Sequence, residues 1–275
     1  MERIKGGNGV DIAVYDEGNR TGPAILLVHG FNQAALCFQR QRDSDLAKKF
    51  RLVSMDMRGH GASGRPWAPE AYNDARPIAD DIDAVLNHCE IESFVFVGWS
   101  MGGNWAADYM RHYGTGRMRG LFLISSPTQQ GTDITAKMFG RGAADNLGGM
   151  FSADPKANID GTIGFLRACT ENPLPPSEFD VLLAYNMMVQ PEIRQWMLGR
   201  VADNGDVFGK LDVPFMQVHG SADRIVLPFA GEYTLRQIPH DNKKMVIYDG
   251  IGHSPFWEAA DRLNGDLADF VEGLA

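Results

Sequence analysis

The stretch Gly98-Trp99-Ser100-Met101-Gly102 decides how the rest of the sequence is interpreted. It follows residues 93–97, a short apolar run that predicts a strand, and precedes residues 103–110, whose spacing predicts an amphipathic helix. Gly-x-Ser-x-Gly between a strand and a helix is typical of a sharp turn that lifts the serine hydroxyl above a sheet edge. The N–H groups at the start of the helix then stabilise developing negative charge. We therefore expect Ser100 to be a nucleophile; the alternative is an ordinary strand-to-helix turn that contains a serine.

The composition predicts a globular protein with an acidic surface. The 275 residues suffice for one large α/β domain or for a core domain with a substantial insertion. Hydrophobic residues make up 44% and charged residues 22% of the chain, as in folded proteins. The net charge of -9 argues against nucleic acid or an anionic membrane as the main partner, because both would repel the chain. The sequence leaves open whether the protein is a monomer or a homodimer.

The start of the chain and the cysteines predict a cytoplasmic protein. Residues 1–9 lack the apolar core of a signal peptide, and no later run is apolar for long enough to span a bilayer. Cys37, Cys89 and Cys169 are far apart and odd in number, so neither a disulfide framework nor a zinc site is indicated.

Strand-like and helical segments alternate over most of the chain. The predicted strands are residues 24–28, 51–56, 93–97, 120–125, 213–218 and 244–248, and the other predicted helices are 35–49, 77–90, 229–238 and 255–274. Residues 1–17 alternate apolar and polar side chains around Gly6-Gly7-Asn8-Gly9, which predicts a hairpin of two edge strands. The alternation predicts an α/β fold, a parallel sheet with helices on both faces whose ligands bind at the carboxyl ends of the strands.

Residues 128–211 follow a different pattern. Helical patterns separated by Gly and Pro replace the strand-like runs, over residues 160–169, 176–189 and 191–201. We expect a helical cap at 128–211, inserted into a core domain made of 1–127 and 212–275. We expect most of its many methionines and aromatic residues to pack the cap onto itself and the core, and a minority to line a pocket. The candidate pocket residues, from cap and core, are Asn32, Trp99, Met138, Phe139, Tyr185, Met188 and Phe256.

The sequence predicts no cofactor. Gly59-x-Gly61-x-x-Gly64 follows a strand, as a dinucleotide-binding fingerprint does, but Pro66 and Pro69 break the helix that would hold a pyrophosphate. We expect a rigid loop at the carboxyl edge of the sheet instead.

The sequence also predicts no metal site. No His-Glu-x-x-His or other paired spacing of metal ligands occurs. Three aspartates near the start of the helix over 77–90 are expected to be solvated residues that favour the helix dipole: Asp80, Asp81 and Asp83.

A nucleophilic serine requires a base beside it, and the base requires a partner that fixes its tautomer. Ser100, Asp223 and His253 each follow a predicted strand and occur in the order nucleophile, acid, histidine. Asp249, which ends the last strand, is the alternative to Asp223. His253 could instead be a turn residue that caps the last helix.

Five blocks, in this order, resemble the α/β-hydrolase fold superfamily over nearly the whole chain. They are residues 29–31, 56–63, 98–103, 219–226 and 252–256. The resemblance implies an α/β-hydrolase fold, with a mostly parallel eight-stranded sheet, helices on both faces and an inserted helical cap. Some members carry the acid one strand earlier, but Ser125-Ser126 at that position is not acidic.

The resemblance also implies roles for single residues. Ser100 would be the nucleophile, His253 the general base and acid, and Asp223 the carboxylate that orients the histidine. The backbone N–H groups of Phe31 and Met101 would form the oxyanion hole. Two other histidines of the matching blocks, His29 and His60, are expected to bond the backbone around the site and not to carry protons.

The function implied is that of a serine hydrolase that cleaves a carboxylic ester or a lactone through an acyl-enzyme, with a small molecule as its partner. Serine at position 100 sets the chain apart from haloalkane dehalogenases and epoxide hydrolases of this fold, which use an aspartate. Short runs at 98–100, 118–121 and 252–256 are similar to serine-type acyl-homoserine lactonases. Two alternatives stay open: a cofactor-free perhydrolase of the non-haem haloperoxidase type, and a small-molecule receptor or stress regulator on the same fold.

Overall fold

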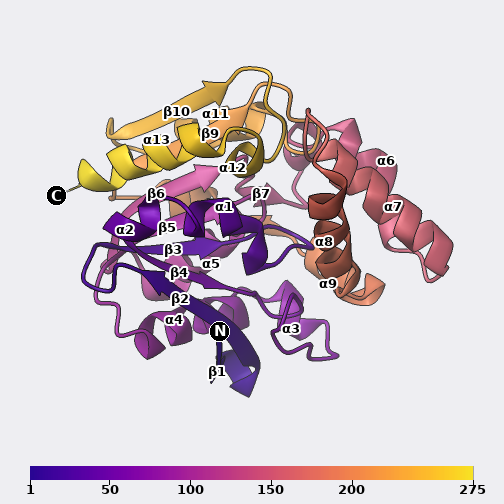
Figure 1. Ribbon diagram of the computed structural model, residues 1–275, viewed down its shortest axis with the longest axis horizontal. Coiled ribbons are helices and arrows are strands. Elements are labelled where there is room, and N and C mark those ends of the chain that lie inside the picture. The colour runs from indigo at the N-terminus through magenta and orange to yellow at the C-terminus, as the bar shows by residue number, and fades with distance from the viewer. Residues whose placement is uncertain (275) are drawn as a thin grey trace.

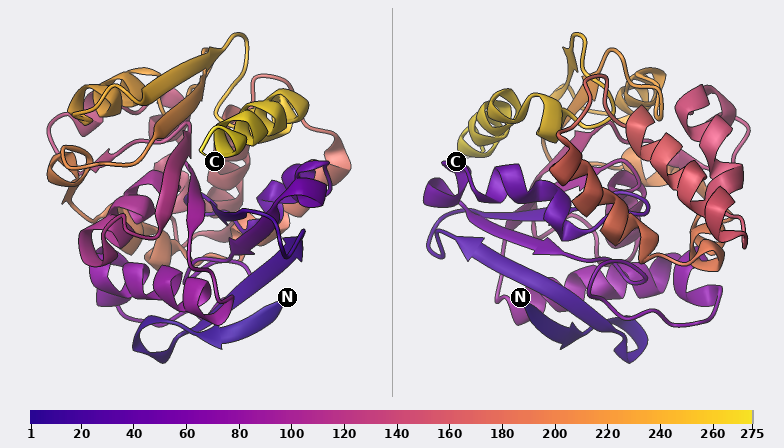
Figure 2. Two further views of the ribbon diagram at one scale, coloured as in Figure 1. Left: turned by 90° about the vertical axis from the view of Figure 1, so that its left-hand side faces the viewer. Right: turned by 45° about the vertical axis from the view of Figure 1, so that its right-hand side comes forward.

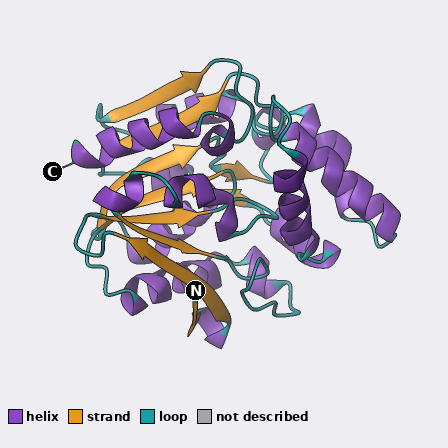
Figure 3. Ribbon diagram, in the orientation of Figure 1, coloured by secondary structure: helices purple, strands orange, loops and turns teal. Residues whose placement is uncertain are grey.

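An eight-stranded sheet forms the centre of the computed structural model, which describes residues 1–274 (Figures 1 and 3). The strand order is β1-β2-β4-β3-β5-β6-β9-β10. The bounds are β1 Glu2–Lys5, β2 Asp11–Gly18, β3 Ala24–Val28, β4 Arg51–Met55, β5 Phe94–Trp99, β6 Met118–Ile124, β9 Phe215–Gly220 and β10 Lys243–Tyr248. β2 runs antiparallel to both of its neighbours, and the other adjacent strands are parallel. The predicted α/β-hydrolase fold class is confirmed.

The central strands are apolar along their whole length because helices cover both faces of the sheet. In β3, Leu26 and Val28 pack into one hydrophobic cluster, while Ile25 and Leu27 pack into a second one. Successive side chains of a strand point to opposite faces, so the two clusters lie on opposite sides of the sheet.

Two sets of helices cover these faces (Figure 2). α4 (Ala75–His88), α5 (Gly102–Tyr113) and α11 (Phe229–Gln237) contribute to the first cluster. α2 (Leu46–Lys49), α12 (Pro255–Glu258) and α13 (Ala260–Glu272) contribute to the second. The remaining short helices outside the segment between β6 and β9 are η1 Gly7–Gly9, η2 Ala35–Phe38, α1 Gln39–Arg42 and α3 Glu70–Asn73.

Most of the chain between β6 and β9 lies beyond the carboxyl ends of the strands (Figure 1). Its main helices are α6 (Arg141–Met150), α7 (Pro155–Ala168), α8 (Pro176–Met187) and α9 (Pro191–Leu198). The shorter elements are β7 Gln129–Gln130, η3 Thr135–Lys137, β8 Ala202–Asp203 and α10 Gly205–Phe208. β7 and β8 pair with each other, so this segment contains a small two-stranded sheet where we expected no strands. The division into a core and a cap at 128–211 stays a prediction.

Three further details differ from the sequence analysis. The N-terminal hairpin forms, but only β1 is an edge strand, because β2 pairs with β4 on its other side. The helix expected over 35–49 is divided into η2, α1 and α2. The last helix is interrupted at Ala259, which separates α12 from α13.

Asp81 corrects the expectation that the three aspartates near the start of α4 are solvated. Its side chain is buried, and both of its carboxylate oxygens accept bonds from Arg58, at 2.7 and 2.8 Å. The Gly7 N–H donates to the same carboxylate at 2.8 Å. Asp81 therefore ties the loop after β4 to α4 and to the N-terminal hairpin.

Among residues 1–274, no helix combines the length and the apolar character that crossing a membrane requires.

Candidate active site

Ser100 lies on a tight turn between β5 and α5. Its φ of 53° is in the left-handed region that side-chain-bearing residues rarely adopt. The turn brings the backbone of Gly98 and Gly102 together, since a Cβ atom on Gly98 would lie 2.9 Å from the Gly102 carbonyl. A Cβ atom on Gly102 would lie 2.7 Å from the carbonyl oxygen of Val28 in β3. Glycine at both positions thus allows the serine to stand at the end of the central strand.

His253 and Asp223 form a direct pair at the same edge of the sheet. His253 Nδ1 donates to Asp223 Oδ2 at 2.8 Å, and both side chains are buried. The other carboxylate oxygen accepts the backbone N–H groups of Ile225 at 2.8 Å and Val226 at 3.0 Å. Burial alone would raise the pKa of Asp223, but the His253 charge and the hydrogen bonds from His219 and His253 outweigh it and lower that pKa. Asp223 is therefore an ionised acceptor that holds His253 with Nε2 free for chemistry.

A second histidine, His219, shares the Asp223 carboxylate. His219 Nε2 lies 3.2 Å from Asp223 Oδ2 and 2.7 Å from the Val226 carbonyl oxygen, so this nitrogen carries a proton. His219 lies in the matching block 219–226, but the sequence indicated no role for it. Its position, four residues before Asp223 at the end of a buried strand, was the available signal.

The competing acid, Asp249, faces away from the histidine. Its side chain is exposed and accepts the Ser221 hydroxyl at 3.1 Å. The geometry therefore favours Asp223 over Asp249 as the partner of His253.

Trp99 connects the serine turn to the histidine. It precedes Ser100 directly, and its Nε1 donates to the His253 carbonyl oxygen at 3.0 Å. The Trp99 and His253 ring centroids are 5.4 Å apart. No hydrogen bond joins Ser100 Oγ to His253 Nε2 among the described residues. Such bonds are often long in unliganded enzymes and shorten when the substrate binds.

Two unpaired amides lie beside the serine. A Cβ atom on Gly30 would come within 2.8 Å of Ser100 Cβ, so the loop after β3 touches Ser100 through its backbone. Within residues 1–274, neither the Phe31 N–H nor the Met101 N–H has a hydrogen-bond acceptor. Free N–H groups next to a nucleophile are the groups that an oxyanion requires.

Two histidines brace this loop from behind. His29 Nε2 accepts the Met57 N–H at 3.0 Å, while its Nδ1 donates to the Gly30 carbonyl at 2.8 Å. His60 Nε2 accepts the Asn32 N–H at 3.2 Å. Burial lowers the pKa of both imidazoles, and that of His60 falls far below its ordinary value. Both rings therefore stay neutral and bond the backbone.

A small, mostly apolar cavity of about 40 Å³ opens beside Ser100. Its polar side chains are Ser100, Asn104 and Gln130. The rest of the lining is Phe31, Met101, Pro127, Phe139, Ala143, Leu147, Phe165, Leu198 and Ile225. Helices α6, α7 and α9 thus supply much of the wall, together with the two loops that carry the free amides.

Of the seven residues expected to line a pocket, Phe139 lines this cavity and the other six do not. Trp99, Met138 and Phe256 are fully packed in the hydrophobic clusters. Asn32 is buried in a polar network, and Met188 is 48% exposed at the surface. Tyr185 bonds Gln33 and borders a separate hollow against α1.

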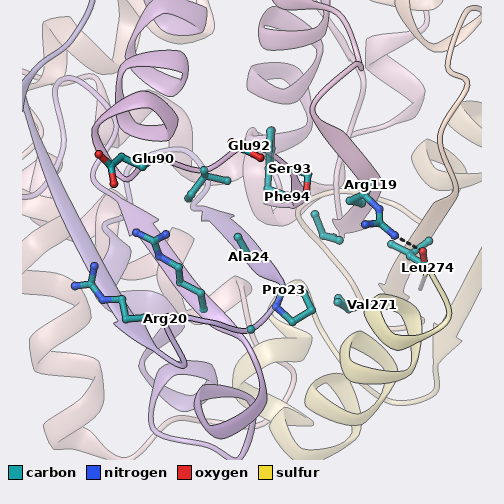
Figure 4. A pocket seen from close by; sticks show the side chains of 14 residues that line it. Arg20, Pro23, Ala24, Glu90, Glu92, Ser93, Phe94, Arg119, Val271 and Leu274 are labelled. Atoms are coloured by element: carbon teal, nitrogen blue, oxygen red, sulfur yellow. Dashed lines mark hydrogen bonds between the residues drawn. The ribbon is translucent and has the colours of Figure 1, made fainter.

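A larger hollow of about 390 Å³ lies at the opposite edge of the sheet (Figure 4). Ala24 and Phe94, which line it, begin β3 and β5, whereas Ser100 follows the other end of β5. Its charged lining mixes both signs, with Arg20 and Arg119 opposite Glu90 and Glu92 (Figure 4). This hollow is therefore separate from the candidate active site.

The described residues contain no group of three or more His, Cys, Asp or Glu side chains that could hold a metal ion. The three cysteines within them are separate buried thiols.

The strand order and the serine turn at the end of β5 define the class of α/β hydrolases. The chain belongs to the alpha/beta hydrolase fold family, whose model matches residues 23–260.

Relatives cover the chain from end to end. The AB hydrolase superfamily protein YisY of Bacillus subtilis is 28% identical over 97% of both chains. The bifunctional esterase/perhydrolase DCH of Acinetobacter calcoaceticus is 28% identical over 96% of this chain and 97% of its own. The esterase RhEst1 of Rhodococcus sp. ECU1013 superposes with a TM-score of 0.91 at 28% identity, over 100% of this chain and 99% of its own.

Proposed function

We propose that the protein is a carboxylic ester hydrolase that works by acyl transfer, with Ser100, His253 and Asp223 as its triad. The hydrogen bond between His253 Nδ1 and Asp223 Oδ2, 2.8 Å long, carries the proposal. It fixes the tautomer in which Nε2 accepts a proton, and Trp99 holds this histidine next to the serine turn.

In the proposed mechanism, Ser100 Oγ attacks the ester carbonyl carbon while His253 Nε2 takes the hydroxyl proton. The carbonyl oxygen becomes an oxyanion that accepts hydrogen bonds from the backbone N–H groups of Phe31 and Met101. Collapse of the tetrahedral intermediate expels the alcohol, which receives the proton from His253. Water, activated by the same imidazole, then releases the acid and restores Ser100.

The cavity supports a short acyl group. The space beside Ser100 is small, about 40 Å³, and its lining is mostly apolar, which favours a short apolar acyl group. We infer a preference for short acyl chains on this basis. A lactone whose ring fits the same space offers an equivalent carbonyl.

A series of nitrophenyl esters from acetate to octanoate, together with simple lactones, tests the proposal on the native protein and on Ser100→Ala. We expect steady multiple turnover of the short esters and loss of nearly all activity in the variant. Equal rates for the two proteins would refute the role of Ser100. A single slow turnover by the native protein would favour the receptor hypothesis.

A second candidate function is perhydrolysis, and the similarity to the bifunctional esterase/perhydrolase DCH favours it. Hydrogen peroxide would replace water in attack on the acyl-enzyme and yield a peracid. Peracid formation from acetate ester and peroxide, measured beside ester hydrolysis, separates the two activities: a peracid-to-acid ratio that merely follows the peroxide-to-water ratio would count against perhydrolysis.

A further inference from the structure

Arg194 is a buried cation without an acidic partner. Its side chain on α9 is 0% exposed, and none of the ion pairs within residues 1–274 includes it. Burial lowers the pKa of Arg194 to about 10, which still leaves the guanidinium charged at neutral pH. An unpaired buried charge is strongly unfavourable unless neutral acceptors surround it. Its hydrogen-bond partners therefore indicate why it is there.

The guanidinium joins four separate parts of the chain. Nη1 donates to the Met150 carbonyl at the end of α6 at 2.9 Å and to Asn158 Oδ1 on α7 at 3.1 Å. Nη2 donates to the Asn186 carbonyl on α8 at 2.9 Å. Nε donates to Asn32 Oδ1 at 2.9 Å, and Asn32 lies in the loop after β3, not in α6 to α9. Only this last bond reaches the loop that touches Ser100.

Asn32 sits on the turn that presents the Phe31 amide. The Gln33 N–H donates to the Gly30 carbonyl at 3.3 Å, which closes a four-residue turn. Asn32 is the third residue of that turn and has a φ of 62°, as a type II turn requires. Its side-chain oxygen is held by Arg194, and its Nδ2 donates to Asn186 Oδ1 at 2.8 Å. Both side-chain contacts thus come from α8 and α9.

We propose that Arg194 is a positioning residue for the oxyanion hole: through Asn32 it fixes the turn that aims the Phe31 N–H at the developing oxyanion beside Ser100. The inference rests on the proposed function, because the oxyanion exists only if Ser100 attacks a carbonyl. It also assigns α6 to α9 a role beyond covering the site, since they hold a part of the catalytic apparatus through one side chain.

The alternative role for Arg194 is to cross-link the helices and nothing more. A cross-link alone would affect stability and leave the transition state of the folded enzyme unchanged. A positioning residue would change kcat with little change in KM, because the misaligned amide binds the ground state as before but stabilises the oxyanion less.

The test compares four variants with the native protein. Arg194→Met removes the charge and all the hydrogen-bond donors of the side chain. Arg194→Lys keeps the positive charge on a shorter side chain. Asn32→Gly keeps the freedom for a positive φ but removes the contact with Arg194. Arg40→Ala is the control, because it removes a different arginine that bonds α8, through an ion pair with Glu178 at 2.8 Å, away from the turn.

Each folded variant is assayed for kcat and KM on a short nitrophenyl ester and for inhibition by a trifluoromethyl ketone, which forms an oxyanion adduct with a serine. We expect Asn32→Gly and Arg194→Met to lower kcat about 10- to 100-fold with KM changed less than about twofold. The inhibition constant should rise in parallel. Arg194→Lys should recover part of the loss, and Arg40→Ala should match the native enzyme.

A kcat within twofold of native in Asn32→Gly would overturn the inference, whether or not Arg194→Met folds. A loss confined to KM, or ketone inhibition unchanged in a slow variant, would overturn it as well. Labelling by a fluorophosphonate distinguishes failure of the proposed function from failure of the role proposed for Arg194. A native protein that is not labelled at Ser100 refutes the proposed function, whereas native labelling with unaffected variants refutes only the role of Arg194.

Discussion

Glycine 30 shows how closely single residues determine the candidate site. Its Cα hydrogen faces Ser100, so the loop that carries the Phe31 amide approaches Ser100 more closely than any side-chain-bearing residue would allow. The positive φ of Ser100 also contributes to this close approach, because it places the serine side chain on the side of the turn that faces the loop.

Gly30→Ala should therefore remove activity without unfolding the protein. The added Cβ would lie 2.8 Å from Ser100 Cβ, so the loop must move away from Ser100. The Phe31 N–H would then lie too far from the proposed oxyanion to donate to it. We expect kcat to fall at least about 100-fold, the usual effect of losing an oxyanion donor. Gly265→Ala, whose Cβ meets nothing within 4 Å, is the matched control and should retain native kcat. Native kcat in Gly30→Ala would contradict this arrangement.

The buried histidines His29 and His60 should make stability depend on pH. Their pKa values are lowered in the folded protein, whereas an unfolded histidine titrates near pH 6.5. The unfolded state therefore binds protons first, and stability that is complete above pH 6.5 is lost as the pH falls below it. At pH 5 each imidazole that stays neutral lowers the free energy of unfolding by about 2 kcal/mol.

Urea unfolding at pH 7.5 and pH 5.0 measures this effect. His60→Gln should show a pH dependence about 2 kcal/mol smaller than the native protein. The same pH dependence in both proteins would show that His60 is protonated in the folded state at pH 5.

The unit of β5, the serine turn and α5 is the element that determines the site. Gly98 and Gly102 let α5 begin directly against β3, which places the N-terminus of this helix beside Ser100.

Gly102→Ala tests this close approach. A Cβ atom there would lie 2.7 Å from the Val28 carbonyl oxygen, and backbone atoms cannot move aside as a flexible side chain can. We expect the free energy of unfolding to fall by about 1–3 kcal/mol, the usual effect of overpacking. Gly148→Ala in α6, with open space around it, should instead raise it by about 0.5–1 kcal/mol. Equal effects of the two changes in chemical denaturation would contradict the packing described here.

The elements differ in how well the sequence predicts them, for physical reasons. The central strands could be predicted because short, continuous apolar runs are typical of buried strands. The serine turn could be predicted because Gly98 and Gly102 flank Ser100 directly after such a run. The break between α1 and α2 depends on Ser44, whose hydroxyl donates to the Gln41 carbonyl at 2.7 Å and accepts the Leu46 N–H at 3.2 Å. Such local side-chain bonds compete with the helix, and the apolar pattern does not reveal them.

Long-range partners explain the other errors. Asp81 is a charged residue near the start of a helix, where aspartates are commonly exposed to solvent. Only the folded chain brings Arg58 and the Gly7 N–H within hydrogen-bond distance of it. Trp99, Met138 and Phe256, three of the expected pocket residues, lie elsewhere because large apolar side chains pack a core as readily as they line a cavity. The order Ser100, Asp223, His253 did indicate which side chains share one edge of the sheet, because that edge collects the carboxyl ends of parallel strands.

At the scale of the whole molecule, helices from between β6 and β9 close the space above the sheet edge. Ion pairs and single side chains attach them at several points, including Arg200 to Asp108 of α5 and Arg194 to Asn32. The attachment leaves a cavity whose size sets the substrate that we infer.

Ala143→Leu tests that size limit. Ala143 lines the cavity from α6, and a larger side chain would fill it. In the native enzyme, each buried methylene should raise kcat/KM about fourfold until the space is full. The variant should prefer acetyl esters, while Phe139→Ala should accept longer chains. Ile159→Ala, 40% exposed on α7, is the control and should keep the native preference. An unchanged preference in both cavity variants would show that the acyl chain binds elsewhere.

The central claim is that Ser100 is a nucleophile activated by His253. The most direct measurement is reaction with a small alkyl fluorophosphonate, followed by mass spectrometry of the peptides. The account predicts one adduct, on Ser100, formed rapidly in the native protein, slowly in His253→Ala and not at all in Ser100→Ala. An adduct on another residue, or labelling of Ser100 at the native rate without His253, would contradict it.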